Sequence, residues 1–166
     1  RAYSVVYQLD VDGLDDRLIF QWFRHGETGP GDEVDEGERW FEEETEVFTH
    51  PRDPHHRVDA LRSSRHIRVE IGGTVVGETR NPVLVFETGL PTRYYLPPDD
   101  VDFSVLEESE WRTSCPYKGT ARYWSFVGQP PAENVAWSYP EPFAAVADIE
   151  GYLCFYDDAA EITVED

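Results

Sequence analysis

The stretch "HIRVEIGGTVVGET", residues 66–79, predicts the architecture of the chain. Apolar and polar residues alternate on both sides of a Gly-Gly pair, which is the pattern of two antiparallel strands joined by a two-residue turn. Short stretches rich in β-branched and aromatic residues, separated by turn residues, recur along the 166 residues. We therefore predict a mainly β fold with largely antiparallel sheets.

Other local patterns predict the remaining elements. The segment 142–152, "PFAAVADIEGY", predicts one short helix, because Pro142 lies near its first turn and Gly151 just beyond its end. Residues 24–39, rich in Gly and acids, predict a surface loop. Residues 40–48 fit a short helix or an edge strand. Further strands are predicted at residues 4–9, 17–23, 82–88, 92–97, 101–108, 120–128, 133–140, 152–156 and 161–165.

The charge of the chain restricts its partners. It has 14 Lys and Arg against 34 Asp and Glu, a net charge of −20. Nucleic acids are bound mainly through clustered basic residues, so we predict no nucleic-acid partner, and an anionic membrane surface would repel the chain. No apolar run approaches the ~20 residues of a membrane span. Such a surface suits solubility, a cationic partner or a salt-rich environment.

The two cysteines, Cys115 and Cys154, are not in a Cys-x-x-Cys pair. A secreted disulfide scaffold would contain more cysteine, so we predict a reducing, cytoplasmic location. A chain of this length buries enough surface to fold without disulfides or metals. No phosphate-binding glycine loop and no Gly-x-Ser-x-Gly elbow occurs, and no cofactor is predicted.

Lys118 is the only lysine, and every other strongly basic side chain is arginine. Among aromatic residues such an amine could be desolvated and act as a base or nucleophile. Pro116 and Gly119 indicate a bend that could bring Cys115 beside it, where an ammonium would activate the thiol. The alternative is that Cys115 is a small buried hydrophobe and Lys118 pairs with a carboxylate.

Two further stretches offer candidate site residues. Glu87 ends an apolar strand, where its carboxylate could serve as a general base at a pocket rim, or form a salt bridge with Arg93 or Lys118. Trp137 and Tyr139 fall on one face of a strand and could wall a pocket or fill the core.

The histidines offer a weaker possibility. His50, His55 and His56, with Asp53, could hold a metal. Zinc sites require a defined ligand spacing, and neighbouring His residues on an irregular segment rarely orient both rings inward, so we favour an ion-paired loop and predict no metal.

Four motifs occur in order: "RHIRVEIGGTVV", "LVFETGLPTRYYLPPDDV", "CPYKGTARYWS" and "NVAWSYPEPFAAVADIEGYLCFY". In this combination, residues 50–166 resemble the DUF427 family of bacteria and fungi. The resemblance implies a β-tent fold, in which curved antiparallel sheets meet over a cleft, and a bacterial source. It also implies a DUF427-like domain at residues 40–166, preceded at residues 1–39 by a β-hairpin and an acidic Gly-rich loop. The family's motif also has a lysine at the position of Lys118.

We therefore predict an aromatic-lined cleft that binds a small molecule and could support catalysis. The candidate catalytic residues are Lys118 as cation or amine, Cys115 as thiol and Glu87 as acid or base. Candidate ligand contacts are Arg93, Tyr95, Tyr117, Trp124, Asn134, Trp137 and Tyr139.

Several alternatives stay open. The chain could be a non-catalytic module that binds a peptide, a protein or a metabolite, or Lys118 and Glu87 could form a purely structural ion pair. Nucleotidyl transfer is implied by a label of the family, although no motif supports it. A homodimer is compatible with the sequence.

Overall fold

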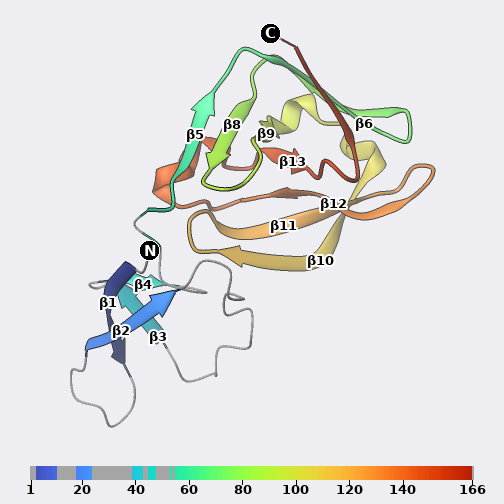
Figure 1. The fold of residues 1–166 in the computed structure, drawn as a ribbon. Helices are drawn as coiled ribbons and strands as arrows, with labels where there is room; N and C mark the ends of the chain where they lie inside the picture. The colour runs from blue at the N-terminus through green and yellow to red at the C-terminus, as the bar shows by residue number, and fades with distance from the viewer. Residues whose placement is uncertain are drawn as a thin grey trace. The chain divides into compact units, whose positions relative to one another are not determined.

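The computed structural model describes residues 53 and 55–165, together with four strands nearer the N-terminus (Figure 1). The described chain is mainly β, and its sheets are antiparallel and not closed, as predicted. The chain divides into two compact units. One comprises residues 1–56 with 114–116, and the other residues 57–113 with 117–166.

The first unit contains a four-stranded sheet of order β2-β1-β3-β4. The β1–β2 hairpin confirms the strands predicted at 4–9 and 17–23. Residues 40–48, which fitted either a helix or a strand, contribute to a second hairpin. The strands are β1 (Tyr3–Asp10), β2 (Leu18–Phe23), β3 (Arg39–Glu42) and β4 (Thr45–Val47).

The second unit is built on two sheets. The larger has the order β10-β11-β12-β13-β9-β8-β5 and the smaller the order β14-β6-β7. In Figure 1, β6 and the C-terminal strand β14 run side by side. The strands are β5 (Val58–Arg62), β6 (His66–Ile71), β7 (Thr74–Thr79), β8 (Val83–Glu87), β9 (Arg93–Leu96), β10 (Leu106–Cys115), β11 (Gly119–Phe126), β12 (Ala132–Ser138), β13 (Leu153–Phe155) and β14 (Glu161–Glu165).

The β6–β7 hairpin forms where the Gly-Gly pair predicts it. Gly72 and Gly73 have φ of +57° and +80°, which a two-residue turn of this hand requires and glycine adopts at little steric cost. The alternation of β6 then buries every second side chain. These side chains enter a core between the two sheets, against residues of β9, β12 and β13 such as Leu96, Ala136 and Phe155.

Two strands differ from the sequence-based expectation. β5 was not among the predicted strands, and it pairs with β8 through the whole of its length. The strand predicted at 101–108 begins only at Leu106, because Asp102 caps a 3-10 turn, η2 (Phe103–Val105), through its side chain. A similar turn, η1 (Pro98–Asp100), precedes it.

The predicted helix at 142–152 is wrong in type. The segment forms 3-10 turns, η3 (Ala144–Ile149), and Val146 inside it has non-helical backbone angles. Gly151 donates its backbone N–H to the carbonyl of Tyr139 at 3.1 Å, so pairing with the end of β12 stops the segment after two turns. Isolated helices of this length are unstable on their own, and tertiary contacts decide their form. None of the helices in the described residues combines the length and apolar character needed to cross a bilayer.

Candidate functional site

Glu87 is placed by the strand that it ends. Val83, Leu84 and Val85 of β8 are buried, and the strand is paired on both sides, between β9 and the edge strand β5. Glu87 follows at the end of this apolar run, and its side chain is only 9% exposed. A carboxylate so poorly hydrated requires a partner.

Lys118 is that partner. Its Nζ atom forms an ion pair with Glu87 Oε2, and the lysine side chain is only 10% exposed. The sequence left open whether Glu87 would pair with Arg93 or Lys118, and the structure shows the pair with Lys118. Because both groups are withdrawn from water, their attraction is screened far less than that of a surface pair.

Gly119 explains how Lys118 is held. Its φ of +109° lies in a region that other residues rarely adopt, and a Cβ atom there would come within 3.0 Å of the Glu141 carbonyl oxygen. Beside it, the backbone N–H of Phe143 donates to the Lys118 carbonyl at 3.1 Å. The motif around Lys118 and the motif around Trp137 to Pro142 therefore pack against each other.

Two of the aromatic candidates, Tyr95 and Trp137, lie in one row across the large sheet. Strand pairing aligns Tyr123 with Trp137, Trp137 with Cys154, and Cys154 with Tyr95. Directly opposed residues project from the same face of a sheet, so these four form one row across β11, β12, β13 and β9. We call them the aromatic row. All four are buried, and none belongs to the core between the two sheets.

The aromatic row is held by specific contacts. The Trp137 indole N–H donates to the Tyr95 hydroxyl at 3.0 Å, and their rings meet edge to face with centroids 6.3 Å apart. Tyr156 packs on Trp137 with a centroid separation of 4.4 Å. At the other end, the hydroxyls of Tyr123 and Thr113 are hydrogen-bonded at 2.8 Å. Such ring pairs contribute beyond their buried area.

Arg93 joins the aromatic row to the solvent-exposed turn after β13. Its guanidinium lies 5.5 Å from the centre of the Trp137 ring, within the range of a cation–π interaction. Its Nη1 atom also donates to Asp157 Oδ2 at 2.7 Å. The predicted ligand contacts Arg93, Tyr95 and Trp137 are therefore brought together.

Burial controls the ionisation of the row. It raises the pKa of the Tyr95 hydroxyl well above its usual value near 10, with further electrostatic contributions from Cys154, Tyr139 and Glu87. It also raises the pKa of the Cys154 thiol. The pKa of Tyr156 is raised to about 12 by burial and then by its hydrogen bond with Tyr123. The hydroxyls of Tyr95 and Tyr156 and the thiol of Cys154 are therefore neutral near pH 7.

Other predicted residues lie elsewhere. The Trp124 ring packs against the core between the sheets and meets Phe103 edge to face at 6.4 Å. Asn134 has a φ of +51°, and its Oδ1 atom accepts a hydrogen bond from the Ser109 hydroxyl at 2.6 Å. Neither lies with the aromatic row. Tyr117 is half-buried, and Tyr139 is buried directly after β12. Cys115 is half-buried in the first unit, and its proximity to Lys118 stays a prediction.

Sequence reasoning missed Tyr123, Cys154 and Tyr156 as members of this arrangement. The alternation Gly119, Ala121, Tyr123 along β11 would have indicated the first, because these three are buried and the residues between them are exposed. Tyr156 follows Cys154 by two residues, the spacing that returns a side chain to the same face of a strand.

The histidine segment is only partly described. His50 lies outside the described residues. The backbone N–H of His55 donates to Asp53 Oδ1 at 2.8 Å, an arrangement typical of a turn. Among the residues that the structure describes, no group of three or more His, Cys, Asp or Glu side chains could hold a metal ion.

The second unit is thus a β domain with a buried Lys–Glu pair and a row of aromatic side chains. Residues 59–166, more than half of the chain, match a domain of unknown function, DUF427, whose label refers to NTP transferases. The chain belongs to this family, as its motifs predicted. A comparison with curated proteins finds no match to the chain.

Proposed function

We propose that the protein binds a small polar molecule at the Lys118–Glu87 pair, with the neighbouring aromatic side chains as apolar walls. The observation that carries the proposal is the burial of both charged side chains, at 10% and 9% exposure. A buried ion pair contributes little net stability, and apolar residues of similar volume often serve a fold as well or better. Two desolvated charges are therefore better explained by recognition than by folding.

The chemistry of the pair favours binding and proton transfer over covalent catalysis. An ammonium next to a carboxylate is kept in its charged form and is then a cation and proton donor, not a free nucleophile. Lys118 would bind an anionic or carbonyl oxygen of the ligand, and Glu87 would accept a proton or hydrogen bond from it. Lysine suits this role because its compact ammonium can release a proton, whereas a guanidinium cannot.

A second candidate is a purely structural tie, which the same ion pair favours. In that case Lys118 would fix the bend before β11 to the end of β8 and touch no ligand. An interaction module without chemistry is a third candidate, which would bind a peptide, a protein or a metabolite and transfer no proton.

The test is a thermal-shift screen of a panel of carboxylate, phosphate and amide metabolites against the whole chain and three variants. Lys118→Met with Glu87→Leu removes both charges and keeps the volume. Lys118→Arg keeps the charge but not the ammonium. Glu87→Lys with Lys118→Glu keeps an ion pair and moves the ammonium to β8. Circular dichroism checks that each variant is folded.

We expect metabolites that raise the melting temperature of the unchanged chain to lose this effect in the doubly apolar and the swapped variants. A ligand at one hundred times its Kd stabilises by about 2.7 kcal/mol, which is readily measured. Retention of the effect in Lys118→Arg would indicate that charge alone is needed. Unchanged ligand responses in the doubly apolar variant would contradict the proposal and leave the structural tie.

A further inference from the structure

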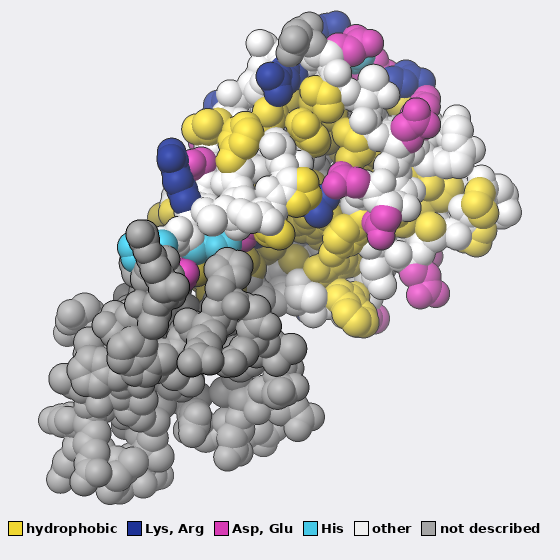
Figure 2. Space-filling model, in the orientation of Figure 1, with side chains coloured by type: hydrophobic (Ala, Val, Ile, Leu, Met, Phe, Trp, Pro, Cys, Tyr) yellow, Lys and Arg dark blue, Asp and Glu magenta, His cyan; other side chains and the backbone are white. Residues whose placement is uncertain are grey.

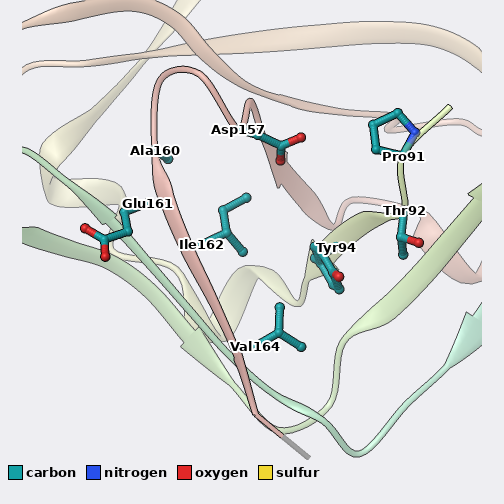
Figure 3. Close-up of a pocket in the computed structure, with 8 residues that line it drawn as sticks. All are labelled: Pro91, Thr92, Tyr94, Asp157, Ala160, Glu161, Ile162 and Val164. Atoms are coloured by element: carbon teal, nitrogen blue, oxygen red, sulfur yellow. The ribbon is translucent and has the colours of Figure 1, made fainter.

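A hollow of about 440 Å³ lies between β9 and β14, on the second unit (Figure 3). This volume is in the range of small-molecule sites. We call it the β9–β14 pocket. Its lining residues are Pro91, Thr92, Tyr94, Asp157, Ala160, Glu161, Ile162 and Val164.

The β9–β14 pocket is separate from the site of the proposed function. Tyr94 and Tyr95 are neighbours on β9, and successive side chains of a strand point to opposite faces of its sheet. Tyr95 belongs to the aromatic row, whereas Tyr94 is aligned with Leu84 on β8, which is aligned with Leu61 on β5. Tyr94 therefore lies on the sheet face that also carries the core.

The core covers only part of that face. The small sheet packs over β9, β12 and β13, and β14 is its edge strand. On the same face, the large side chains of Leu61 on β5 and Phe86 on β8 are exposed. Figure 2 shows hydrophobic side chains gathered over β5 and β8. The β9–β14 pocket lies at this boundary between the covered and uncovered parts of the face.

The interior of the pocket is apolar with one charged end. Figure 3 shows Ile162 and Val164 pointing from β14 toward Tyr94, while Glu161 points to the other side of the strand. The Asp157 carboxylate lies at one end, near Pro91. No Lys, Arg or His side chain is among the lining residues.

Asp157 has unused hydrogen-bonding capacity. Its Oδ2 atom accepts one hydrogen bond from Arg93, and its side chain is 53% exposed. A carboxylate can accept about four hydrogen bonds, so Oδ1 is available to a ligand. The net charge of the chain, −20, also favours the approach of a cation and opposes that of an anion.

We propose that the β9–β14 pocket binds a small organic cation with an apolar body. The ammonium group of such a ligand donates to Asp157. Its body packs on the Tyr94 ring and on Ile162 and Val164 of β14. An aromatic or branched aliphatic amine has this combination of groups.

The test is a titration of the whole, isotope-labelled chain followed by NMR chemical shifts in 150 mM NaCl. The probes are phenethylamine, phenethyl alcohol and 3-phenylpropionate, which share a ring and differ in charge. The variants are Asp157→Asn and Ile162→Glu. Asp158→Asn is the matched control, because Asp158 is the exposed acidic neighbour of Asp157 and does not line the pocket.

We expect the amine to bind most tightly, the alcohol less tightly and the carboxylate least, with the largest shifts at Tyr94, Ile162 and Val164. Asp157→Asn should lower amine affinity about tenfold, or about 1.4 kcal/mol, because the ammonium group loses its charged hydrogen-bond acceptor. Asp158→Asn should change it less than twofold, and Ile162→Glu should abolish alcohol binding. Equal affinities of amine and alcohol, equal effects of the two Asp variants, or shifts confined to other residues would overturn the proposal.

Discussion

Tyr94 and Tyr95 are adjacent on β9 and have the same side chain, yet their surroundings differ completely. Tyr95 is 1% exposed, accepts a hydrogen bond from Trp137 and belongs to a row of buried rings. Tyr94 is half-buried and lines a hollow open to solvent. The difference arises from strand alternation alone, which assigns one ring to each face of the sheet.

The comparison shows how a thin sheet can keep two kinds of surface apart. The face of Tyr95 is filled by aromatic contacts. Glu87, which is ion-paired with Lys118, interacts electrostatically with Tyr95. The face of Tyr94 is apolar and only partly covered. The stability of the chain should therefore respond strongly to the loss of single atoms or charges on the first face and tolerate substitutions on the second.

The largest expected effect is that of Lys118→Met. Removing the ammonium leaves the Glu87 carboxylate buried without its cation, which should lower the free energy of unfolding by about 3–5 kcal/mol. Lys118→Met combined with Glu87→Leu should recover most of this loss. Urea unfolding of the single and double variants measures both. If Lys118→Met alone were as stable as the unchanged chain, the pair would have to be hydrated, and the expected sensitivity of this face to the loss of a charge would be contradicted.

Gly119→Ala should be the next most damaging. Its positive φ and the 3.0 Å approach of the Glu141 oxygen together should reduce stability by about 3 kcal/mol. Gly89→Ala is the control, because Gly89 has a φ of +79° but nothing within 4 Å of the added methyl group. It should lose about 1 kcal/mol. Thermal or urea unfolding of both variants separates the contact from the backbone strain, and equal losses would contradict the close packing.

The two tyrosines themselves give a direct comparison. Tyr95→Phe removes the acceptor of the Trp137 indole N–H and leaves a buried donor unpaired, which should reduce stability by about 2 kcal/mol. Tyr94→Phe, on the open face, should change it by less than about 0.5 kcal/mol. Because the pKa of Tyr95 is raised, Tyr95→Phe should also remove a tyrosine that ionises late in a spectroscopic titration. Equal stabilities would contradict the difference between the faces.

The smallest expected effect concerns the small sheet that carries β14. His66 on β6 contacts Glu165 of β14 at 3.1 Å and Glu78 of β7 at 2.8 Å, and these hydrogen bonds raise its pKa despite the opposing effect of Arg80. Arg68 on β6 also faces Glu78. A raised pKa means that the protonated ring stabilises the fold fully below its usual value near 6.5 and that this is lost as the pH rises through the raised value.

At low pH this contribution is limited by the protonation of Glu78. The pKa of Glu78 is lowered, chiefly by its hydrogen bond with His66. Its contribution is present above the usual value near 4.5 and is lost as the pH falls through the lowered one. The stability difference between the unchanged chain and His66→Gln should therefore be larger at pH 5.5 than at pH 8.5. Urea unfolding at both values measures it, and a difference independent of pH would contradict the bridge.

Much of the fold was predictable from local patterns. The Gly-Gly pair and the alternation around it predicted the β6–β7 hairpin, and the apolar run of β8 predicted a buried strand. β5 was missed because its sequence, VDALR, does not alternate strictly between apolar and polar residues, and pairing with β8 decides its form. Residues 142–152 were predicted as a helix because Pro142 and Gly151 stand where helices commonly begin and end, whereas contacts with the end of β12 decide the form of the segment.

The candidate site was predictable only where local sequence patterns single out a residue. Lys118 was conspicuous as the only lysine, and Glu87 as the acid that ends an apolar strand. Their pairing depends on residues 31 positions apart, so no local pattern could choose between Lys118 and Arg93 as the partner. The neighbours of Trp137 follow from strand register, which sequence alone does not give.

Arg93 has contacts on both sides of the comparison, since it lies over the Trp137 ring and bonds to Asp157 of the β9–β14 pocket. A ligand cation that competes for Asp157 would weaken the ion pair between Arg93 and Asp157. It would thereby change the cation–π contact between Arg93 and the Trp137 indole. Thermodynamic linkage then requires reciprocity. If a ligand on one face changes the affinity for a ligand on the other face by some factor, the second ligand changes the affinity for the first by the same factor. Arg93 alone would thus couple ligand binding at two chemically separate surfaces.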